Sequence, residues 1–120
     1  MDDAADVARA VDEVVPAVRG GAGPVRAGQA GEAYVRARYD IGPKTRFEIN
    51  DRYRIADGMT DNSISEVKNV RYQGLTKQIR DYLDFKGAKQ FYLYVRRDTR
   101  LSRQLLARVA DGSIILRYID

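Results

Sequence analysis

Three charged residues in the middle of the sequence have the types and spacing needed to hydrolyse a phosphodiester. Glu66 and Lys68 are two apart in an alternating polar and apolar run. Their side chains should therefore leave one face of a strand, roughly 6–7 Å apart at the backbone. Asp57 ends an earlier alternating run, and facing side chains in a hairpin lie within about 5 Å of each other. We therefore expect Asp57, Glu66 and Lys68 to converge.

A divalent cation would complete such a group of side chains. Two carboxylates in one site repel each other, and Mg²⁺ or Mn²⁺ relieves that repulsion while accepting oxygen ligands. A bound metal lowers the pKa of water and stabilises a phosphate under attack. Lys68 would orient or deprotonate the attacking water, or neutralise the phosphate. The alternative is a surface ion pair of Glu66 and Lys68, with Asp57 as a turn residue. Asp61, in the predicted turn, ranks second for the role of Asp57.

Composition excludes most other catalytic sites. The 120 residues include no Cys and no His. Disulfides, thiolate nucleophiles, zinc–thiolate sites, Ser-His-Asp triads and imidazole bases are therefore excluded. The chain is 44% hydrophobic and 32% charged, which is typical of one folded domain. No apolar run approaches the roughly 20 residues of a membrane span.

The elements that must position these residues follow from hydrophobic periodicity. Helices are predicted over residues 2–15, 29–39, 75–86 and 101–110, and strands over 46–49, 53–56, 63–68, 90–95 and 113–118. Thr76 is a candidate cap for the third helix, and residues 58–62 form a turn. Residues 20–28 have the composition of a Gly-rich linker, which predicts a lead-in over 1–28 and a domain over 29–120. This order is typical of an α/β or α+β fold with one mixed sheet between helices, in which the last two helices allow parallel pairing.

Positive charge is concentrated after the lead-in. The net charge is +4, with five Arg and seven acidic residues in 1–40, and sixteen Lys or Arg and ten acidic residues in 41–120. The second part is therefore +6, which indicates a polyanionic partner or a solvated basic surface. Candidate phosphate contacts are Arg71, Lys77 and Arg80, with Tyr72 among them, and a second cluster of Arg96, Arg97, Arg100 and Arg103. Nothing resembles a base-reading motif, so little sequence preference is expected.

Several of these segments together resemble the PD-(D/E)XK superfamily. More narrowly, they are similar to the restriction-endonuclease-fold toxin domains at the C-termini of bacterial polymorphic toxins such as Rhs proteins. The resemblance covers about residues 29–120, and is carried by Arg54–Gly58, Glu66–Val70, Leu75–Leu83, Leu93–Arg96 and Thr99–Ser102. One departure is Ala56, which stands before Asp57 where the motif has Pro. The resemblance implies a restriction-endonuclease-like α-β-β-β-α-β core, here with an extra C-terminal helix and strand.

The resemblance also implies roles for individual residues. Asp57 and Glu66 would be metal ligands and Lys68 the catalytic lysine. Gln78 and Tyr82 lie four apart on one helix face, like the Gln-x-x-x-Tyr of RecB-like members, where the pair lies beside the active site and helps to hold DNA or the lysine. The alternative is a core Tyr with a surface Gln.

Glu32 is a further candidate metal ligand. Many superfamily members carry an acidic residue on the helix before the sheet, and that residue reaches the metal site. Glu32 lies on the corresponding predicted helix. The alternative is a glutamate that the helix dipole favours near the helix N-terminus.

The function implied by the resemblance is hydrolysis of DNA by a metal-dependent endonuclease with Mg²⁺ or Mn²⁺. Such a domain is an antibacterial toxin, released from a larger secreted protein, that acts in the cytoplasm of the target cell. Asp2 and Asp3 stand at the N-terminus in place of the basic and apolar regions of a secretion signal, so either export needs another route or this chain is one piece of a larger polypeptide. An immunity protein would block the active site in the producing cell, and an acidic one would suit the +6 region. No membrane partner and no small-molecule cofactor are expected.

Three alternatives stay open. The fold could serve a non-catalytic nucleic-acid-binding module, an RNase toxin, or a DNA-repair nuclease such as a junction resolvase.

Overall fold

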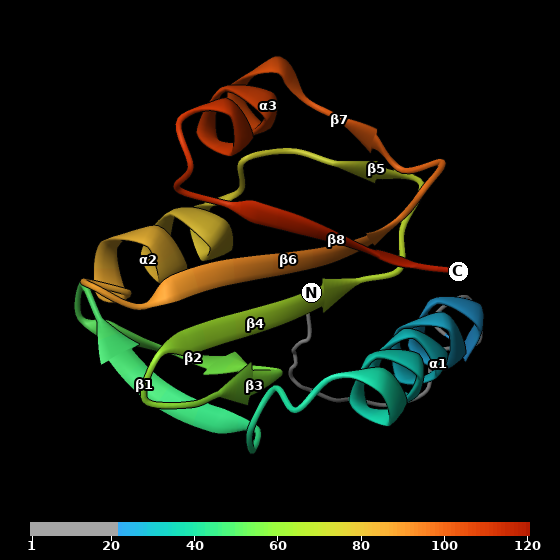
Figure 1. Ribbon diagram of the computed structural model, residues 1–120, viewed down its shortest axis with the longest axis horizontal. Coiled ribbons are helices and arrows are strands. Elements are labelled where there is room, and N and C mark those ends of the chain that lie inside the picture. The colour runs from blue at the N-terminus through green and yellow to red at the C-terminus, as the bar shows by residue number, and fades with distance from the viewer. Residues whose placement is uncertain (1–21) are drawn as a thin grey trace.

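The structure is a computed structural model that describes residues 22–120, and its elements surround one mixed sheet (Figure 1). The helices are α1 (Ala22–Arg38), α2 (Lys77–Phe85) and α3 (Arg103–Ala110). The strands are β1 (Thr45–Ile49), β2 (Arg52–Ala56), β3 (Gly58–Met59), β4 (Ser63–Lys68), β5 (Tyr72–Gln73), β6 (Gln90–Arg96), β7 (Arg100–Leu101) and β8 (Ile115–Ile119). The predicted helix over 2–15 lies outside the described residues.

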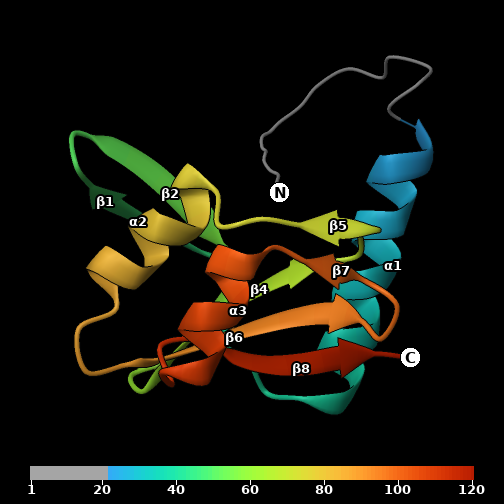
Figure 2. The ribbon, with the colours of Figure 1, turned by 90° about the horizontal axis from the view of Figure 1, so that it is seen from above.

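The central sheet has the strand order β3–β4–β6–β8. β3 is antiparallel to β4, whereas β4 pairs in parallel with β6, and β6 with β8. The two parallel pairs are joined through α2 and α3, because parallel strands need a long crossover connection. α1 lies on one face of the sheet, and α2 and α3 lie on the other (Figures 1 and 2). The prediction of a mixed sheet with parallel pairing through these helices is confirmed.

Alternation along the central strands divides the core between the two faces. On β6, Phe91, Leu93 and Val95 pack in the larger cluster with residues of α2 and α3. Tyr94 belongs to a smaller cluster with residues of α1, and so does Val67 of β4. Since Val67 faces α1, the residues on either side of it face α2.

β1 and β2 form a separate antiparallel hairpin. Its turn residues Asn50 and Asp51 both have positive φ, 55° and 63°, as a tight two-residue hairpin turn requires. The prediction that all three N-terminal strands join one sheet was therefore wrong. The predicted turn over 58–62 contains β3, which pairs with β4 in place of β2. A two-residue strand is too short to show any periodicity.

α1 begins earlier than predicted. Residues 22–28, expected to be part of a flexible linker, are helical. Pro24 lies in the first turn, where its missing N–H removes no helical hydrogen bond. The Asn69 side chain donates to the Ala27 carbonyl at 2.8 Å, and a Cβ on Gly31 would lie 3.0 Å from the Asn69 Cβ. Packing against the end of β4 therefore stabilises the first turns of α1, although their glycines and proline do not favour a helix.

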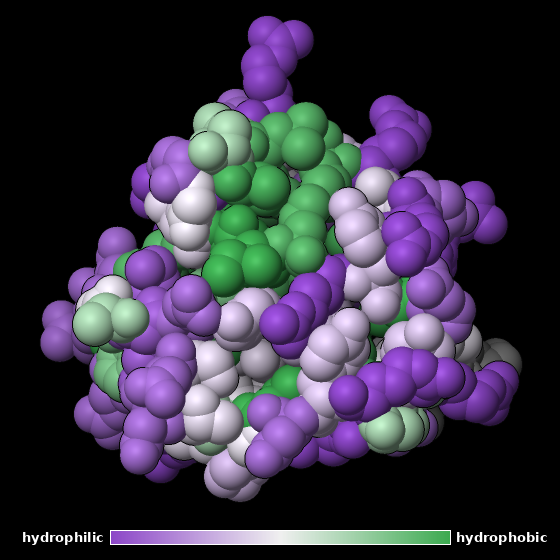
Figure 3. Space-filling view, viewed as in Figure 1, coloured by the Kyte–Doolittle hydropathy of each residue, from purple (hydrophilic) through white to green (hydrophobic). Residues whose placement is uncertain are grey.

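α3 begins two residues later than predicted. The Ser102 hydroxyl accepts a hydrogen bond from the Leu105 N–H at 3.1 Å and caps the helix, while Leu101 belongs to β7. β7 pairs in parallel with β5, and neither two-residue strand was predicted. Figure 3 shows an apolar area over α3 and β8. Leu106 of α3 is exposed. The predicted cap at Thr76 is confirmed, because its hydroxyl accepts from the Ile79 N–H at 3.3 Å.

A buried carboxylate joins the β1–β2 hairpin to α2. Asp81 accepts hydrogen bonds from Arg52 at 2.8 and 2.9 Å, from Arg54 at 2.8 Å and from Asn50 at 3.3 Å. Burial acts to raise the pKa of Asp81, but these hydrogen bonds outweigh it and hold the pKa below the usual value for an aspartate. Asp81 thus keeps its charge at neutral pH and fixes the hairpin against the helix.

Asp81→Asn is expected to lower the free energy of unfolding by about 1–3 kcal/mol at pH 7, because the arginines lose a charged acceptor. A depressed folded-state pKa stabilises above the unfolded pKa, and this stabilisation is lost as pH falls through the folded pKa. Urea unfolding at pH 7 and at about pH 3 checks this, with Asp61→Asn, at the exposed turn before β4, as control. A deficit in Asp81→Asn that stays constant over this range would contradict the assignment.

Candidate active site

Glu66 and Lys68 lie side by side on the face of β4 that meets α2. Both are buried, with 2% and 4% of their surfaces exposed. The Lys68 Nζ lies 3.3 Å from the Glu66 Oε2 and donates to the Gln78 Oε1 at 2.9 Å. The predicted common face is confirmed, and the pair is not the surface ion pair considered as the alternative.

Two side chains of α2 complete this cluster. Gln78 donates from its Nε2 to the Tyr82 hydroxyl at 3.1 Å. That hydroxyl lies 3.0 Å from the Glu66 Oε1 and 3.1 Å from the Ile55 carbonyl oxygen, either of which can accept its proton. Tyr82 is fully buried and also packs against Phe47. The spacing of Gln78 and Tyr82 thus places both polar groups beside Glu66 and Lys68, as predicted.

Asp57 lies at the edge of β4 that pairs with β3. It lies between β2 and β3, and its Oδ2 accepts a hydrogen bond from the Val67 N–H at 2.8 Å. β3 pairs Gly58 with Ser65, and that register continues to set Asp57 opposite Glu66. Asp57 and Glu66 are therefore brought together, although by β3 and not by the end of β2. Asp61 is exposed at the hairpin turn, which favours Asp57 over Asp61.

The loop between α1 and β1 holds the backbone next to Asp57. A Cβ on Gly42, whose φ is +81°, would lie 2.1 Å from the Met59 carbonyl oxygen, and one on Gly58 would lie 2.4 Å from the Ile41 carbonyl oxygen. The Met59 N–H donates to the Pro43 carbonyl at 3.1 Å. The loop and β3 thus meet backbone to backbone, which only glycine permits at these positions.

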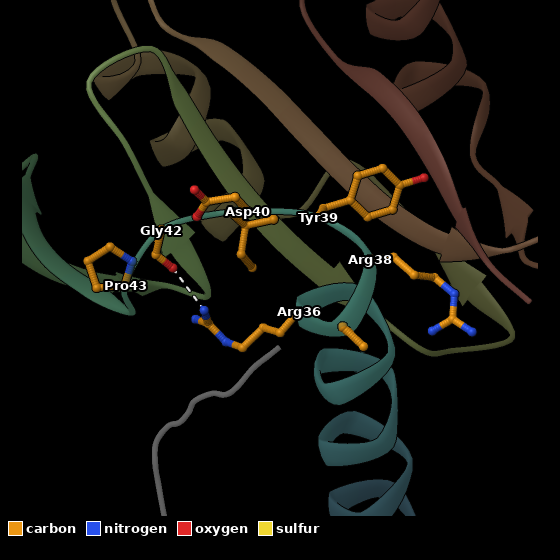
Figure 4. Close-up of a pocket in the computed structure, with 8 residues that line it drawn as sticks. Arg36, Arg38, Tyr39, Asp40, Gly42 and Pro43 are labelled. Atoms are coloured by element: carbon orange, nitrogen blue, oxygen red, sulfur yellow. Dashed lines mark hydrogen bonds between the residues drawn. The ribbon is translucent and has the colours of Figure 1, made fainter.

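Arg36 links this loop to the end of α1. Its guanidinium donates to the Gly42 carbonyl at 2.9 Å, as Figure 4 shows, and also to the Asp57 carbonyl. Residues 36–43 line an open groove of about 600 Å³ beside these contacts. Arg36 therefore helps to fix the backbone that presents the Asp57 carboxylate.

Glu32 of α1 lies near Asp57, and both of its carboxylate oxygens form ion pairs. Its Oε2 lies 3.2 Å from the Arg36 Nε, and its Oε1 lies 3.2 Å from the Lys44 Nζ. Lys44 is also 3.4 Å from the Asp57 Oδ1. Arg36 and Lys44 were missed by sequence reasoning, because nothing distinguishes them from the other basic residues.

Burial and mutual repulsion perturb the charges of the cluster. Burial raises the pKa of Glu66 well above its usual value, and the Asp57 carboxylate adds to this effect. Burial also raises the pKa of Asp57, with a further contribution from Glu32. The pKa of Lys68 is lowered well below its usual value by burial. Burial lowers the pKa of Lys44 too, but Asp57 and Glu32 outweigh this and keep its ammonium charged.

Residues 28–105 match the protein family described as restriction endonuclease fold toxin 7. The chain belongs to this family. The comparisons with curated proteins and with solved structures find no match. Membership confirms the resemblance to restriction-endonuclease-fold toxin domains, and it implies this fold for the mixed sheet and a nuclease activity for the domain. No helix in residues 22–120 is long and apolar enough to cross a membrane.

A divalent cation suits the donor atoms of the toxin domain. Carboxylate oxygens are the ligands that Mg²⁺ prefers, and Asp57 already shares a positively charged neighbour, the Lys44 ammonium, with Glu32. Among residues 22–120, no three acidic side chains are arranged to hold a metal. Mg²⁺ commonly takes only one or two protein carboxylates and keeps several waters. Asp57 and Glu66 would hold such an ion.

The candidate phosphate contacts of the toxin domain differ in their availability. Arg71, Lys77 and Arg80 are exposed, and none of the three forms an ion pair with a described residue. In the second cluster, Arg96 pairs with Asp98 and Arg97 with Asp120, whereas Arg100 and Arg103 are exposed. The first group is therefore wholly available for binding a polyanion, and the second only in part.

Tyr82→Phe tests the contribution of the buried hydroxyl. The variant keeps the ring packing but removes the group that contacts Glu66 and Gln78, so we expect nuclease activity to fall about 10–100-fold, the usual cost of removing a group that orients a metal ligand. Steady-state cleavage rates measure the effect. Tyr53→Phe, at an exposed tyrosine, is the matched control. Unchanged activity in Tyr82→Phe would show that the hydroxyl does not position the cluster.

Proposed function

We propose that the domain is a metal-dependent endonuclease that cleaves DNA. The observation that carries this proposal is the buried pair of Glu66 and Lys68, with Asp57 opposite Glu66 immediately before β3. Burying a carboxylate and a lysine beside a second carboxylate costs folding free energy, and such perturbed charges are concentrated at functional sites. Family membership supports nucleic-acid hydrolysis as the function of this site.

In this proposal Asp57 and Glu66 bind Mg²⁺ or Mn²⁺. When bound, the ion would lower the pKa of a water molecule and place positive charge beside the scissile phosphate. Lys68, held between Glu66 and Gln78, would orient the attacking water or donate to a phosphate oxygen. Tyr82 keeps Glu66 and Gln78 in place, so the lysine has a defined position.

In this proposal the nucleic-acid substrate binds to exposed basic side chains. Arg71, Lys77 and Arg80 would neutralise backbone phosphates, and binding should weaken steeply as salt rises. Contacts to the backbone carry no base information, which supports little sequence preference. DNA is the proposed substrate, and RNA is the competing one.

Cleavage assays test the activity directly. Supercoiled plasmid and total RNA are incubated with the full chain, with EDTA, and with EDTA followed by excess Mg²⁺ or Mn²⁺. We expect plasmid nicking that EDTA abolishes and either metal restores, with RNA left intact. Degradation of RNA alone would replace the proposal with an RNase toxin. Binding without cleavage of either substrate would favour a non-catalytic module.

We also propose that the domain acts as an antibacterial toxin and is one part of a larger secreted protein. The nuclease domain would include all of α1 and extend over residues 22–120, in place of the 29–120 expected from composition, with the residues before Ala22 as its lead-in. A cognate immunity protein would block the site in the producing cell, and the +6 charge of residues 41–120 favours an acidic one.

Expression in a sensitive host, with and without the downstream open reading frame, tests the toxin assignment. We expect growth arrest by the domain alone and rescue by co-expression. Arrest that the neighbouring product does not relieve would count against that product as the immunity protein. Normal growth with an active enzyme would favour a repair nuclease or junction resolvase.

A further inference from the structure

Lys44 joins two acidic side chains that come from different parts of the chain. Its Nζ lies 3.2 Å from the Glu32 Oε1 of α1 and 3.4 Å from the Asp57 Oδ1 before β3. A single ammonium therefore offsets the repulsion between the two carboxylates. Sequence reasoning assigned Glu32 and Asp57 to a metal and gave Lys44 no role.

The two oxygens of Asp57 have different surroundings. Oδ2 is tied to the backbone of β4 through the Val67 N–H at 2.8 Å. Oδ1 faces Lys44. Because Oδ2 is committed to the sheet, Oδ1 is the oxygen better placed to bind an ion. A divalent cation on Oδ1 would then lie beside the Lys44 ammonium, and two positive charges at one oxygen repel each other.

We propose that Lys44 is an internal competitor for the divalent cation. In the metal-free protein it neutralises Glu32 and Asp57, and it leaves the Asp57 Oδ1 when the ion binds. This inference rests on the proposed function, since it requires that Asp57 bind a metal. Lys44 would thereby hold the acidic side chains together before loading while lowering the affinity of the site.

The surroundings of Lys44 allow this exchange. Its side chain is 52% exposed and lies immediately before β1, so the ammonium can move into solvent without disturbing a strand. Glu32 keeps its contact with Arg36 at 3.2 Å when Lys44 leaves. Arg36 in turn remains bound to the Gly42 and Asp57 carbonyls, so the backbone of the site stays in place.

Mn²⁺ titration followed by calorimetry tests the competition without using activity. The full chain is compared as wild type, Lys44→Met and Lys44→Arg at one pH and ionic strength. We expect Lys44→Met to bind Mn²⁺ about 5–50-fold more tightly, within the usual range of coupling between two sites. Lys44→Arg keeps the charge and should stay close to wild type. Circular dichroism of each variant confirms that it is folded.

Chemical labelling of lysines in the wild-type chain gives a second reading that needs no variant. By linkage, an ion that displaces Lys44 should raise its reactivity towards an acetylating reagent. We expect labelling of Lys44 to increase with Mn²⁺, as measured by mass spectrometry. Lys89, which donates to the Thr60 and Asp61 carbonyls at 2.6 and 2.8 Å, is the internal control and should not change.

The outcomes separate the two proposals. Failure of the wild-type chain to bind Mn²⁺ would overturn both the metal-dependent function and the role of Lys44. Binding of Mn²⁺ with unchanged Lys44 labelling, or with equal or weaker affinity in folded Lys44→Met, would overturn the Lys44 assignment alone.

Discussion

Glu66→Gln and Lys68→Met are each expected to abolish DNA cleavage, with rates at least about 10²–10³-fold below wild type. Glu66→Gln removes a charged oxygen ligand from the proposed metal site, and Lys68→Met removes the ammonium beside it. Both variants keep the size of a buried side chain on a central strand. Plasmid nicking with saturating Mg²⁺ or Mn²⁺ measures the effect.

The same variants should not unfold the protein. Burial disfavours the charged forms of Glu66 and Lys68, and this offsets part of the stability lost when either partner of their buried ion pair is removed. We therefore expect both variants to remain folded in EDTA, with cooperative urea unfolding transitions. Loss of cleavage in a folded variant separates a catalytic role from a structural one.

Glu48→Gln is the matched control for Glu66→Gln. Glu48 lies on β1 with 81% of its side chain exposed, and the change is chemically identical. It should leave both cleavage and stability unchanged. Full activity in Glu66→Gln or in Lys68→Met would remove that residue from the mechanism.

Gly42→Ala is expected to cause the largest loss of stability among single methyl additions. The new Cβ would lie 2.1 Å from the Met59 carbonyl oxygen, at a backbone φ of +81° that disfavours any side chain. The loop or β3 must move, and both flank the backbone that presents Asp57. We expect a loss of roughly 3 kcal/mol or more in the free energy of unfolding, with reduced cleavage.

Gly112→Ala separates the two causes of this loss. Gly112 has nearly the same φ, +85°, but no atom lies within 4 Å of its added Cβ. It should therefore show only the cost of the backbone conformation, about 1–2 kcal/mol. Urea unfolding of both variants gives the comparison. Equal losses at the two glycines would contradict the close approach of the loop to β3.

Local patterns were sufficient for the parts of the site that lie on one element. A spacing of two on a strand places Glu66 and Lys68 on one face, and a spacing of four on a helix places Gln78 and Tyr82 on another. The N-cap at Thr76 is equally local. These relations depend only on the geometry of a strand or helix, so the residue types and their spacing determined them.

Contacts between distant segments depended on the tertiary structure. Lys44 meets Asp57, Arg52 and Arg54 meet Asp81, and residues 22–28 become helical because α1 packs against β4. No periodicity records which of many charged side chains will pair across the fold, because that choice depends on how the loop, hairpin and helices pack. The sequence by itself therefore determined the reactive types and their faces, whereas three-dimensional packing decided their neighbours, burial and charge.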